Sequence, residues 1–356
     1  MTIPEVDDLD AELFTDLLRI GGRLPGDVEV TSVELTPLGG AAGMMSQVLR
    51  ATLTYSGLTS SPATVIVKSG TSDPHRRFVA EAGKLYQREV NFYQRYADDV
   101  PVRAPKGIYA DIDLETNDFI LILEDVGQLR SVDQVEGVSL ADATAAVQAM
   151  ARWHSRWWGA DLEALSEHFF LWNGEFNKAA IPMVFGSNWD AAKAAYAGRL
   201  PPEIVALGDR YVERSGDILD GLMEPNTLVH SDFRADNLLF DGAEPVLLDF
   251  QMLSVGCGMF DFAFFVSQSL TAEARSAHFE ELLTTYLGEL AAHGIVLDRE
   301  VALDKYRRAL VFGLAWPVSL ASGFAALDAR GKALAYSMLD RFVKAVTDVG
   351  AASLYA

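Results

Sequence analysis

The feature that most constrains the fold is a change of pattern near residue 125, where strand-like segments give way to helical ones. Residues 48–55 (VLRATLTY) alternate between two faces, as a half-buried strand does. Residues 64–68 are short and β-branched, and residues 119–123 are apolar throughout, which predicts a strand inside a sheet. Between these two segments, residues 78–96 have the apolar spacing of a helix.

Helical patterns cover most of the remaining chain, over residues 140–158, 273–293 and 300–349. A small group of strand-like segments interrupts them at 227–250. This order predicts an α+β protein in which a β-rich lobe is joined by a short connection to a larger helical lobe. We expect the β-rich lobe to comprise residues 1–124 and the helical lobe residues 125–356.

Charge and cysteine content exclude several classes of protein. The formal net charge of −21 repels phosphate backbones, so we expect no nucleic-acid partner. Cys257 is the single cysteine, which rules out an intramolecular disulfide and a cysteine-rich metal site. The first residues are acidic and lack an apolar run, so they do not resemble a signal peptide, and we expect a cytoplasmic protein. The sequence does not indicate an oligomeric state.

One uncharged stretch, residues 309–327, is long enough to cross a bilayer. It is only weakly apolar, because it contains glycine, serine, proline and several alanines, and no basic cluster marks a flank. We therefore expect no membrane span here but a buried helix, kinked near Pro317.

The segment 227–251 contains the residues that carry chemistry. Two short apolar runs flank an Asp-Gly turn signal, which predicts an antiparallel hairpin. If Phe240 pairs with Val246, then Asn237 lies opposite Asp249 at the open end of the hairpin. Amide and carboxylate oxygens suit Mg²⁺, which takes few protein ligands and completes its octahedron with water and phosphate. The pattern therefore predicts a magnesium site.

Asp232 lies on the loop that leads from a short strand to Asn237. A carboxylate beside the metal pair can orient a substrate hydroxyl and accept its proton during attack on a phosphoryl group. Arg234 is a candidate cation for the transferred phosphate. An ordinary salt bridge with Asp236 explains Arg234 equally well, so both interpretations stay open.

With these motifs, the chain resembles the aminoglycoside phosphotransferase/choline kinase group of protein-kinase-like enzymes, and within it the ecdysteroid kinase-like branch. The superfamily motifs are HSDFRADN at 230–237 and LLDFQ at 247–251. LILEDV, REVNFY and FDFAFF point to the branch. The resemblance covers about residues 33–325 and implies a two-lobe kinase fold. Ser231 stands where the family usually has glycine, so Ser231 carries some strain if its φ is positive.

The resemblance also implies nucleotide-binding residues. Lys68 is similar to the lysine that holds the α- and β-phosphates of ATP, and Glu89 to its ion-pair partner. The backbone of Leu123 and Asp125 would bind the adenine edge. A glycine-rich turn would lay its N–H groups on the phosphates through Gly39, Gly40, Gly43 and Ser46.

Three further features allow two interpretations each. Asp261 resembles the residue that braces the catalytic loop, but an ordinary helix N-cap also fits. His154 is expected to be a core histidine rather than a ligand. The six tryptophans are expected to pack in the core, the alternative being an acceptor pocket that binds apolar or cationic groups.

These residues lead us to expect an ATP- and Mg²⁺-dependent kinase that phosphorylates a hydroxyl of a small molecule. The alternative is a catalytically inactive nucleotide-binding or scaffold protein of the same fold. The presence of Lys68, Asp232, Asn237 and Asp249 favours the enzyme. A protein kinase is disfavoured, because the prompt return to helix by residue 262 leaves little room for a peptide-binding activation segment.

Overall fold

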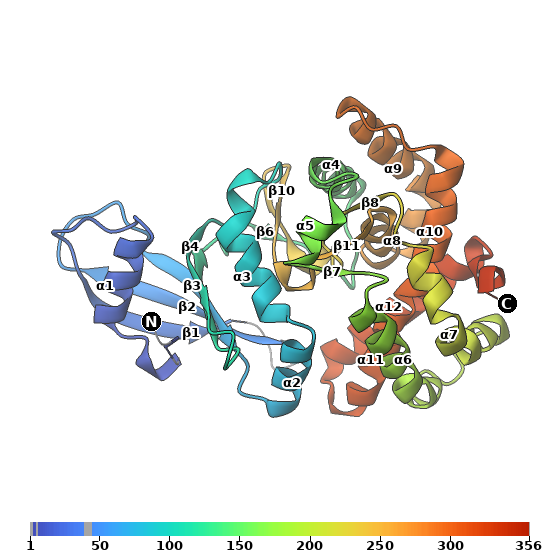
Figure 1. Ribbon diagram of the computed structural model, residues 1–356, viewed down its shortest axis with the longest axis horizontal. Helices are drawn as coiled ribbons and strands as arrows, with labels where there is room; N and C mark the ends of the chain where they lie inside the picture. Colours follow the sequence, from blue (N-terminus) through green and yellow to red (C-terminus); the bar gives the residue numbers. More distant parts are fainter. Residues whose placement is uncertain (1–2, 5, 39–44, 356) are drawn as a thin grey trace. The chain divides into compact units, whose positions relative to one another are not determined.

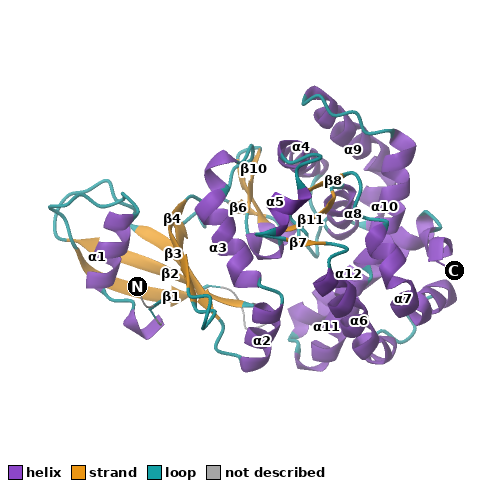
Figure 2. Cartoon of the chain, viewed as in Figure 1, coloured by secondary structure: helices purple, strands orange, loops and turns teal. Residues whose placement is uncertain are grey.

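The structure is a computed structural model that describes residues 3–4, 6–38 and 45–355. The chain forms two compact units (Figure 1). The N-terminal unit comprises Met1–Arg130 together with Val246–Met252, and the helical unit comprises Ser131–Pro245 and Leu253–Ala356. Figure 2 shows that helices dominate the second unit, as the change of pattern near residue 125 predicts. The predicted α+β fold class is confirmed.

The described residues of the N-terminal unit form a five-stranded antiparallel sheet in the order β1-β2-β3-β5-β4. Its strands are β1 (Val30–Pro37), β2 (Ser46–Tyr55), β3 (Thr64–Gly70), β4 (Gly107–Ile112) and β5 (Phe119–Glu124). The alternation predicted for β2 is confirmed, because Leu49, Ala51 and Leu53 are buried. The apolar β5 lies between β3 and β4 and is buried on both faces, which explains why it lacks a polar face: Ile120 and Ile122 belong to one core, and Phe119, Leu121 and Leu123 to the other.

The two faces of this sheet are covered by different helices (Figure 1). The unit has two hydrophobic cores. Helix α1 (Ala11–Ile20) packs Phe14, Leu17 and Leu18 into one of them, and α3 (Leu85–Arg95) packs its apolar side chains into the other. The helix predicted over 78–96 is in fact two, because α2 (Pro74–Ala82) ends at Gly83. Lys84 then adopts a left-handed φ of +49°, which no continuous α-helix accommodates.

The helical unit contains α4 (Leu140–Arg156), α5 (Leu162–Ser166), α6 (Glu175–Ala195), α7 (Pro202–Asp220), α8 (Met259–Gln268), α9 (Ala272–Ala292), α10 (Arg299–Gly313), α11 (Ala315–Leu320) and α12 (Ala329–Asp348). The short strands of the region are β6 (Arg130–Ser131), β7 (Phe170–Leu171), β8 (Asn226–Val229), β9 (Leu238–Asp241), β10 (Glu244–Leu247) and β11 (Ser254–Cys257). Short 3₁₀ turns occur at Val6–Asp8, Ala97–Asp99, Ala235–Asn237, Phe250–Met252, Ala321–Ala326 and Ala351–Tyr355. Strands β9 and β10 are neighbours, as the Asp-Gly turn predicts, and the boundary between the units falls inside β10.

Helix α8 is the centre of the helical unit. Every one of its residues is buried, and α4, α9, α10 and α12 pack around it. Most of the tryptophans are buried, which agrees with the packing interpretation: Trp153, Trp157, Trp172 and Trp189 are buried, whereas Trp158 and Trp316 are half-buried.

The uncharged stretch at 309–327 is divided among the end of α10, α11 and a 3₁₀ turn. Helix α10 ends at Gly313, and Pro317 lies buried in α11. A proline has no N–H for the carbonyl four residues earlier, and its ring collides with that carbonyl, so the helix breaks rather than bends. Across the part of the chain that the structure describes, no helix is both long enough and apolar enough to cross a membrane.

Candidate active site

A buried ion cluster in the N-terminal unit brings together three of the predicted site residues. The Lys68 ammonium, near the end of β3, lies 2.7 Å from both carboxylate oxygens of Glu89 on α3. It also lies 3.1 Å from Asp249 Oδ1. The side chains of Lys68 and Glu89 are 10% and 1% exposed, and that of Asp249 is 27% exposed. The cluster therefore places one cation between two carboxylates.

The charges in this cluster keep the ammonium protonated. Burial alone would lower the pKa of Lys68, but the carboxylates of Asp249 and Glu89 outweigh it and hold that pKa above its ordinary value. Burial raises the pKa of Glu89, against the attraction of Lys68. With both carboxylates ionised, the cluster has a net charge of −1, and its most exposed member is Asp249.

Helix α3 holds the segment Val246–Met252 in the N-terminal unit. The ring of Phe250 stacks on Phe92 with centroids 3.8 Å apart, and Arg88 donates to Met252 O at 3.3 Å. Asp249 has a φ of +66°, and its Oδ2 accepts a hydrogen bond from Gln251. These contacts fix the backbone on both sides of the carboxylate.

The predicted adenine-binding positions lie at the end of β5. Leu123 is inside the sheet, opposite Ile66 of β3 and Gly107 of β4. Asp125 follows the strand, and its carboxylate accepts hydrogen bonds from Arg50 at 2.7 and 3.2 Å. Burial alone would raise the pKa of Asp125, but the hydrogen bonds from Arg50 and Gly127 outweigh it and hold that pKa below its ordinary value. A contact of either residue with a nucleotide stays a prediction.

The predicted glycine-rich turn is described only at its end. Ser46 is buried and begins β2. Gly39, Gly40 and Gly43 lie outside the described residues.

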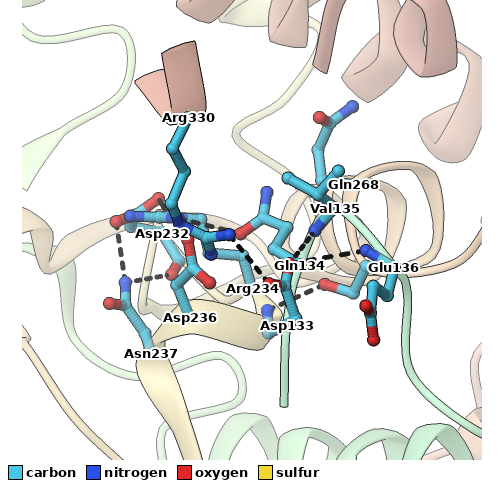
Figure 3. Close-up of polar contacts among 12 residues, drawn as sticks. Asp133, Gln134, Val135, Glu136, Asp232, Arg234, Asp236, Asn237, Gln268 and Arg330 are labelled. Atoms are coloured by element: carbon cyan, nitrogen blue, oxygen red, sulfur yellow. Dashed lines mark hydrogen bonds and ion pairs between the residues drawn. The ribbon is translucent and has the colours of Figure 1, made fainter. Parts of the chain in front are cut away.

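In the helical unit, the loop after β8 brings Asp232, Arg234 and Asn237 together (Figure 3). Asp232 Oδ1 accepts from Arg234 Nε at 3.0 Å, and Asp232 Oδ2 accepts from Asn237 Nδ2 at 2.7 Å. A hydrogen bond at each oxygen fixes the plane of this carboxylate, whose side chain is 17% exposed. Arg234 also donates to Asp236 at 2.8 Å, so the salt-bridge interpretation of Arg234 is confirmed and extends to Asp232.

Asp261 fixes the backbone that precedes Asp232. Its two oxygens accept the N–H groups of His230 at 2.7 Å and of Ser231 at 2.8 Å. Asp261 lies inside α8, whose N-cap is Gly258, so it acts as a brace of this loop and not as an N-cap. Ser231 has a φ of +67°, so the condition under which a side chain here is strained is met.

His154 is a core histidine, as the sequence predicts, but it also supports this brace. Its Nε2 lies 3.1 Å from Asp261 Oδ2, and its Nδ1 lies 2.8 Å from the hydroxyl of Tyr286. A Cβ at Gly258 would come within 2.8 Å of both His154 Nδ1 and the Tyr286 hydroxyl, so this position requires glycine. Tyr286 was not expected from the sequence, because a tyrosine inside a helical pattern is indistinguishable from core.

Gln134 is a second residue that sequence reasoning did not single out. Its Oε1 accepts a hydrogen bond from Arg234 Nη1 at 2.8 Å (Figure 3). A lone glutamine in a loop carries no sequence signal, so only the structure identifies this contact.

The predicted metal ligands belong to different units, Asn237 to the helical unit and Asp249 to the N-terminal unit. Within the described ranges, no group of three or more histidine, cysteine, aspartate or glutamate side chains is arranged to hold a metal ion. The Asn237 amide nitrogen makes both contacts with Asp232, to its backbone oxygen and to Oδ2, so the amide oxygen points elsewhere (Figure 3). An available amide oxygen and a partly exposed carboxylate fit a hard cation such as Mg²⁺. Their pairing stays a prediction.

The sequence matches the family model of the ecdysteroid kinase-like family over residues 40–298. No curated protein matches the chain.

Solved structures share the fold at low sequence identity. Choline kinase from Cryptosporidium parvum Iowa II is 10% identical, with a TM-score of 0.58 over 94% of this chain and 96% of that one. Choline kinase LicA from Streptococcus pneumoniae is 15% identical, with a TM-score of 0.52 over 90% and 94%. The GDP and kanamycin complex of APH(2″)-IIIa is 16% identical, with a TM-score of 0.56 over 93% and 98%. At these identities the likeness shows a kinase-like fold.

Proposed function

The chain belongs to the ecdysteroid kinase-like family, and on that premise we propose that it is a kinase that transfers the γ-phosphoryl group of ATP to a hydroxyl of a small molecule. Family and fold together indicate small-molecule phosphotransferase activity. We further propose that it uses ATP and Mg²⁺, that the acceptor is a hydroxyl, and that its residues have the roles given below.

The observation that carries the proposal is the cluster of Lys68 between Glu89 and Asp249. A buried ammonium fixed by a carboxylate is a point charge that can bind phosphate oxygens without first being ordered. We assign Lys68 to the α- and β-phosphates and Glu89 to holding the lysine rotamer. Ser46, Leu123, Asp125 and the turn with Gly39, Gly40 and Gly43 complete the proposed nucleotide site.

We assign Asp232 to orienting the acceptor hydroxyl and accepting its proton. The support is its fixed plane, because its two oxygens accept hydrogen bonds from Arg234 and from Asn237. Phosphoryl transfer depends chiefly on accurate placement of the nucleophile and on charge stabilisation, and both need a rigid carboxylate. Arg234 forms ion pairs with Asp232 and Asp236 and so balances their charge. We propose that it also contacts the transferred phosphate.

Asn237 and Asp249 are the residues that would hold the magnesium ion. When bound, Mg²⁺ supplies positive charge to the phosphate oxygens. Asp249 would also keep Lys68 in place, since it already lies 3.1 Å from the ammonium.

The proposal is tested by measuring ADP release and phosphorylated product with Mg-ATP and a panel of hydroxylated metabolites, sterols and antibiotics. We expect at least one acceptor to be phosphorylated. Asp232→Asn should reduce transfer roughly 10²–10⁴-fold while the dissociation constant for Mg-ATP stays within a few-fold of wild type.

Two results would contradict these assignments. Transfer by Asp232→Asn near the wild-type rate would mean that another carboxylate, such as Asp236, accepts the proton. Binding of Mg-ATP without transfer to any compound in a broad panel would instead favour an inactive nucleotide-binding or scaffold protein.

A further inference from the structure

Gln134 is a buried polar residue that contacts the catalytic loop from a distant part of the sequence. It lies in the loop that precedes α4, and its side chain is 1% exposed. Its Oε1 accepts a hydrogen bond from Arg234 Nη1 at 2.8 Å, and the Nε of the same guanidinium donates to Asp232. Figure 3 shows Arg234 between Gln134 and Asp232, so a chain of hydrogen bonds connects Gln134 to Asp232.

The backbone that carries Gln134 is itself firmly held. Arg341 of α12, which is 7% exposed, donates to the carbonyl oxygens of Gln134 and Val135 at 2.7 and 2.8 Å. It also donates to the carbonyl of Gln268 at the end of α8, at 2.7 Å. Asp133 accepts the Val135 N–H at 2.7 Å and so closes the turn. Because Arg341 ties this loop to α12 and to the end of α8, the position of the Gln134 side chain is determined by the core of the helical unit.

The side chain of Gln134 is poorly suited to a purely structural role. Among the described residues its Nε2 is buried and has no hydrogen-bond acceptor. A buried unpaired donor is unfavourable, and an apolar side chain of similar length would remove that penalty. Among the described residues, the side-chain hydrogen bond that such a replacement loses is the one that Arg234 Nη1 donates to Oε1. Arg234 itself keeps Asp232 and Asp236 as partners.

We propose that Gln134 is a positioning residue for phosphoryl transfer, which fixes the Arg234 guanidinium and thereby the orientation of the Asp232 carboxylate. This inference rests on the proposed function, in which Asp232 accepts the proton of the acceptor hydroxyl. Gln134 acts only through Arg234, and its contribution to the rate is the accurate placement of the Asp232 carboxylate. Small displacements of a reacting group reduce rates by up to about 10²-fold.

Two substitutions separate positioning from packing. Gln134→Met keeps the length of the side chain but removes the acceptor, so kcat should fall roughly 10- to 100-fold with the KM for Mg-ATP unchanged. Its melting temperature should be equal to or above that of wild type, because the unpaired Nε2 is gone. Gln134→Glu keeps an acceptor oxygen, so kcat should stay within a few-fold of wild type. Its melting temperature should fall, since a third carboxylate is buried beside one guanidinium.

Arg330→Met is the matched control. Arg330 is 60% exposed and forms an ion pair with Asp133 of the same loop, so its loss should change neither kcat nor the NMR signal described below.

A second measurement needs no acceptor. The Arg234 Nε–H signal in ¹⁵N NMR, assigned with Arg234→Lys, should be protected from solvent exchange in wild type and in Gln134→Glu. It should lose protection in Gln134→Met, because the guanidinium is then held by fewer acceptors.

The outcomes separate the two proposals. An active wild type whose kcat and Arg234 Nε–H protection are both unchanged in Gln134→Met overturns the role of Gln134. Lost protection with unchanged kcat overturns it as well, because the contact would then be irrelevant to transfer. A wild-type protein that transfers phosphate to no acceptor contradicts the proposed function, and the NMR measurement then still reports whether Gln134 fixes Arg234.

Discussion

Nε2 of His154 lies 3.1 Å from Oδ2 of Asp261, and neither side chain is exposed to solvent. Since Asp261 accepts the backbone N–H groups of His230 and Ser231, we assign Nε2 as the donor of this imidazole and Nδ1 as the acceptor of the Tyr286 O–H. The order Tyr286–His154–Asp261 thus links three helices to the loop that carries Asp232.

Removal of the Tyr286 hydroxyl should destabilise the protein. Tyr286→Phe leaves His154 Nδ1 buried without its donor, which costs about 1–3 kcal/mol, measured as a lower midpoint of thermal unfolding. Tyr336→Phe is the control, because this half-buried tyrosine has no hydrogen bond from its hydroxyl among the described residues. Equal effects of the two substitutions would mean that the Tyr286–His154 bond contributes nothing.

Ser231→Gly should stabilise the protein by about 1 kcal/mol. The φ of +67° at this position disfavours any side chain, and glycine adopts it without strain. The substitution also removes a buried hydroxyl that has no partner in the described structure. Ser231→Ala separates the two causes, since it removes the hydroxyl but keeps the Cβ. A stabilisation by alanine as large as that by glycine would show that the backbone is not strained.

Lys68→Met should lower the free energy of unfolding by about 3 kcal/mol, because it leaves Glu89 buried without its cation. The double substitution Lys68→Met with Glu89→Gln should recover much of this loss, since no buried charge then remains unpaired. Nucleotide binding should not recover, because the proposed phosphate ligand is still absent. Thermal unfolding and ATP titration of wild type and of the two variants measure both effects. Recovery of ATP binding in the double variant would contradict the role of Lys68.

Much of the loop 230–237 could be predicted because its residues are close together in the sequence. Asp232, Arg234 and Asn237 lie within six positions, and the structure brings them into direct contact. The sequence also singled out Ser231, whose strain depended on a positive φ, and its φ is +67°.

Contacts between distant segments could not be predicted in the same way. His154 was expected to be a satisfied core histidine, but nothing in the sequence pairs it with Asp261, which is 107 positions away. Gln134 and Arg234 are separated by 100 positions. The break at Gly83 was missed because the apolar spacing continues across it, while the left-handed Lys84 depends on tertiary packing.

The Arg50–Asp125 pair should make the protein more sensitive to acid. The pKa of Asp125 in the folded state lies below its unfolded value of about 3.9, so the pair contributes stability above that pH. This contribution should be lost as the pH falls through the folded pKa. Asp125→Asn should therefore lower the melting temperature at pH 7 and reduce its further loss between about pH 4 and pH 2. A parallel pH dependence in the variant and in wild type would contradict the contribution of this pair.

Mg-ATP should raise the melting temperature more than ATP alone, because a ligand that binds the folded state stabilises it by mass action. Asp249→Asn should abolish most of the magnesium-dependent part. Asparagine keeps the shape of the side chain and a bond to Lys68, but it removes the partly exposed negative charge proposed to bind the cation. Glu244→Gln is the matched control, because it also replaces an acid by its amide and removes one negative charge. Glu244 is exposed and lies a few residues before Asp249. It should leave the magnesium-dependent shift intact. Equal shifts with and without magnesium in wild type, or equal losses in both variants, would place the cation away from Asp249.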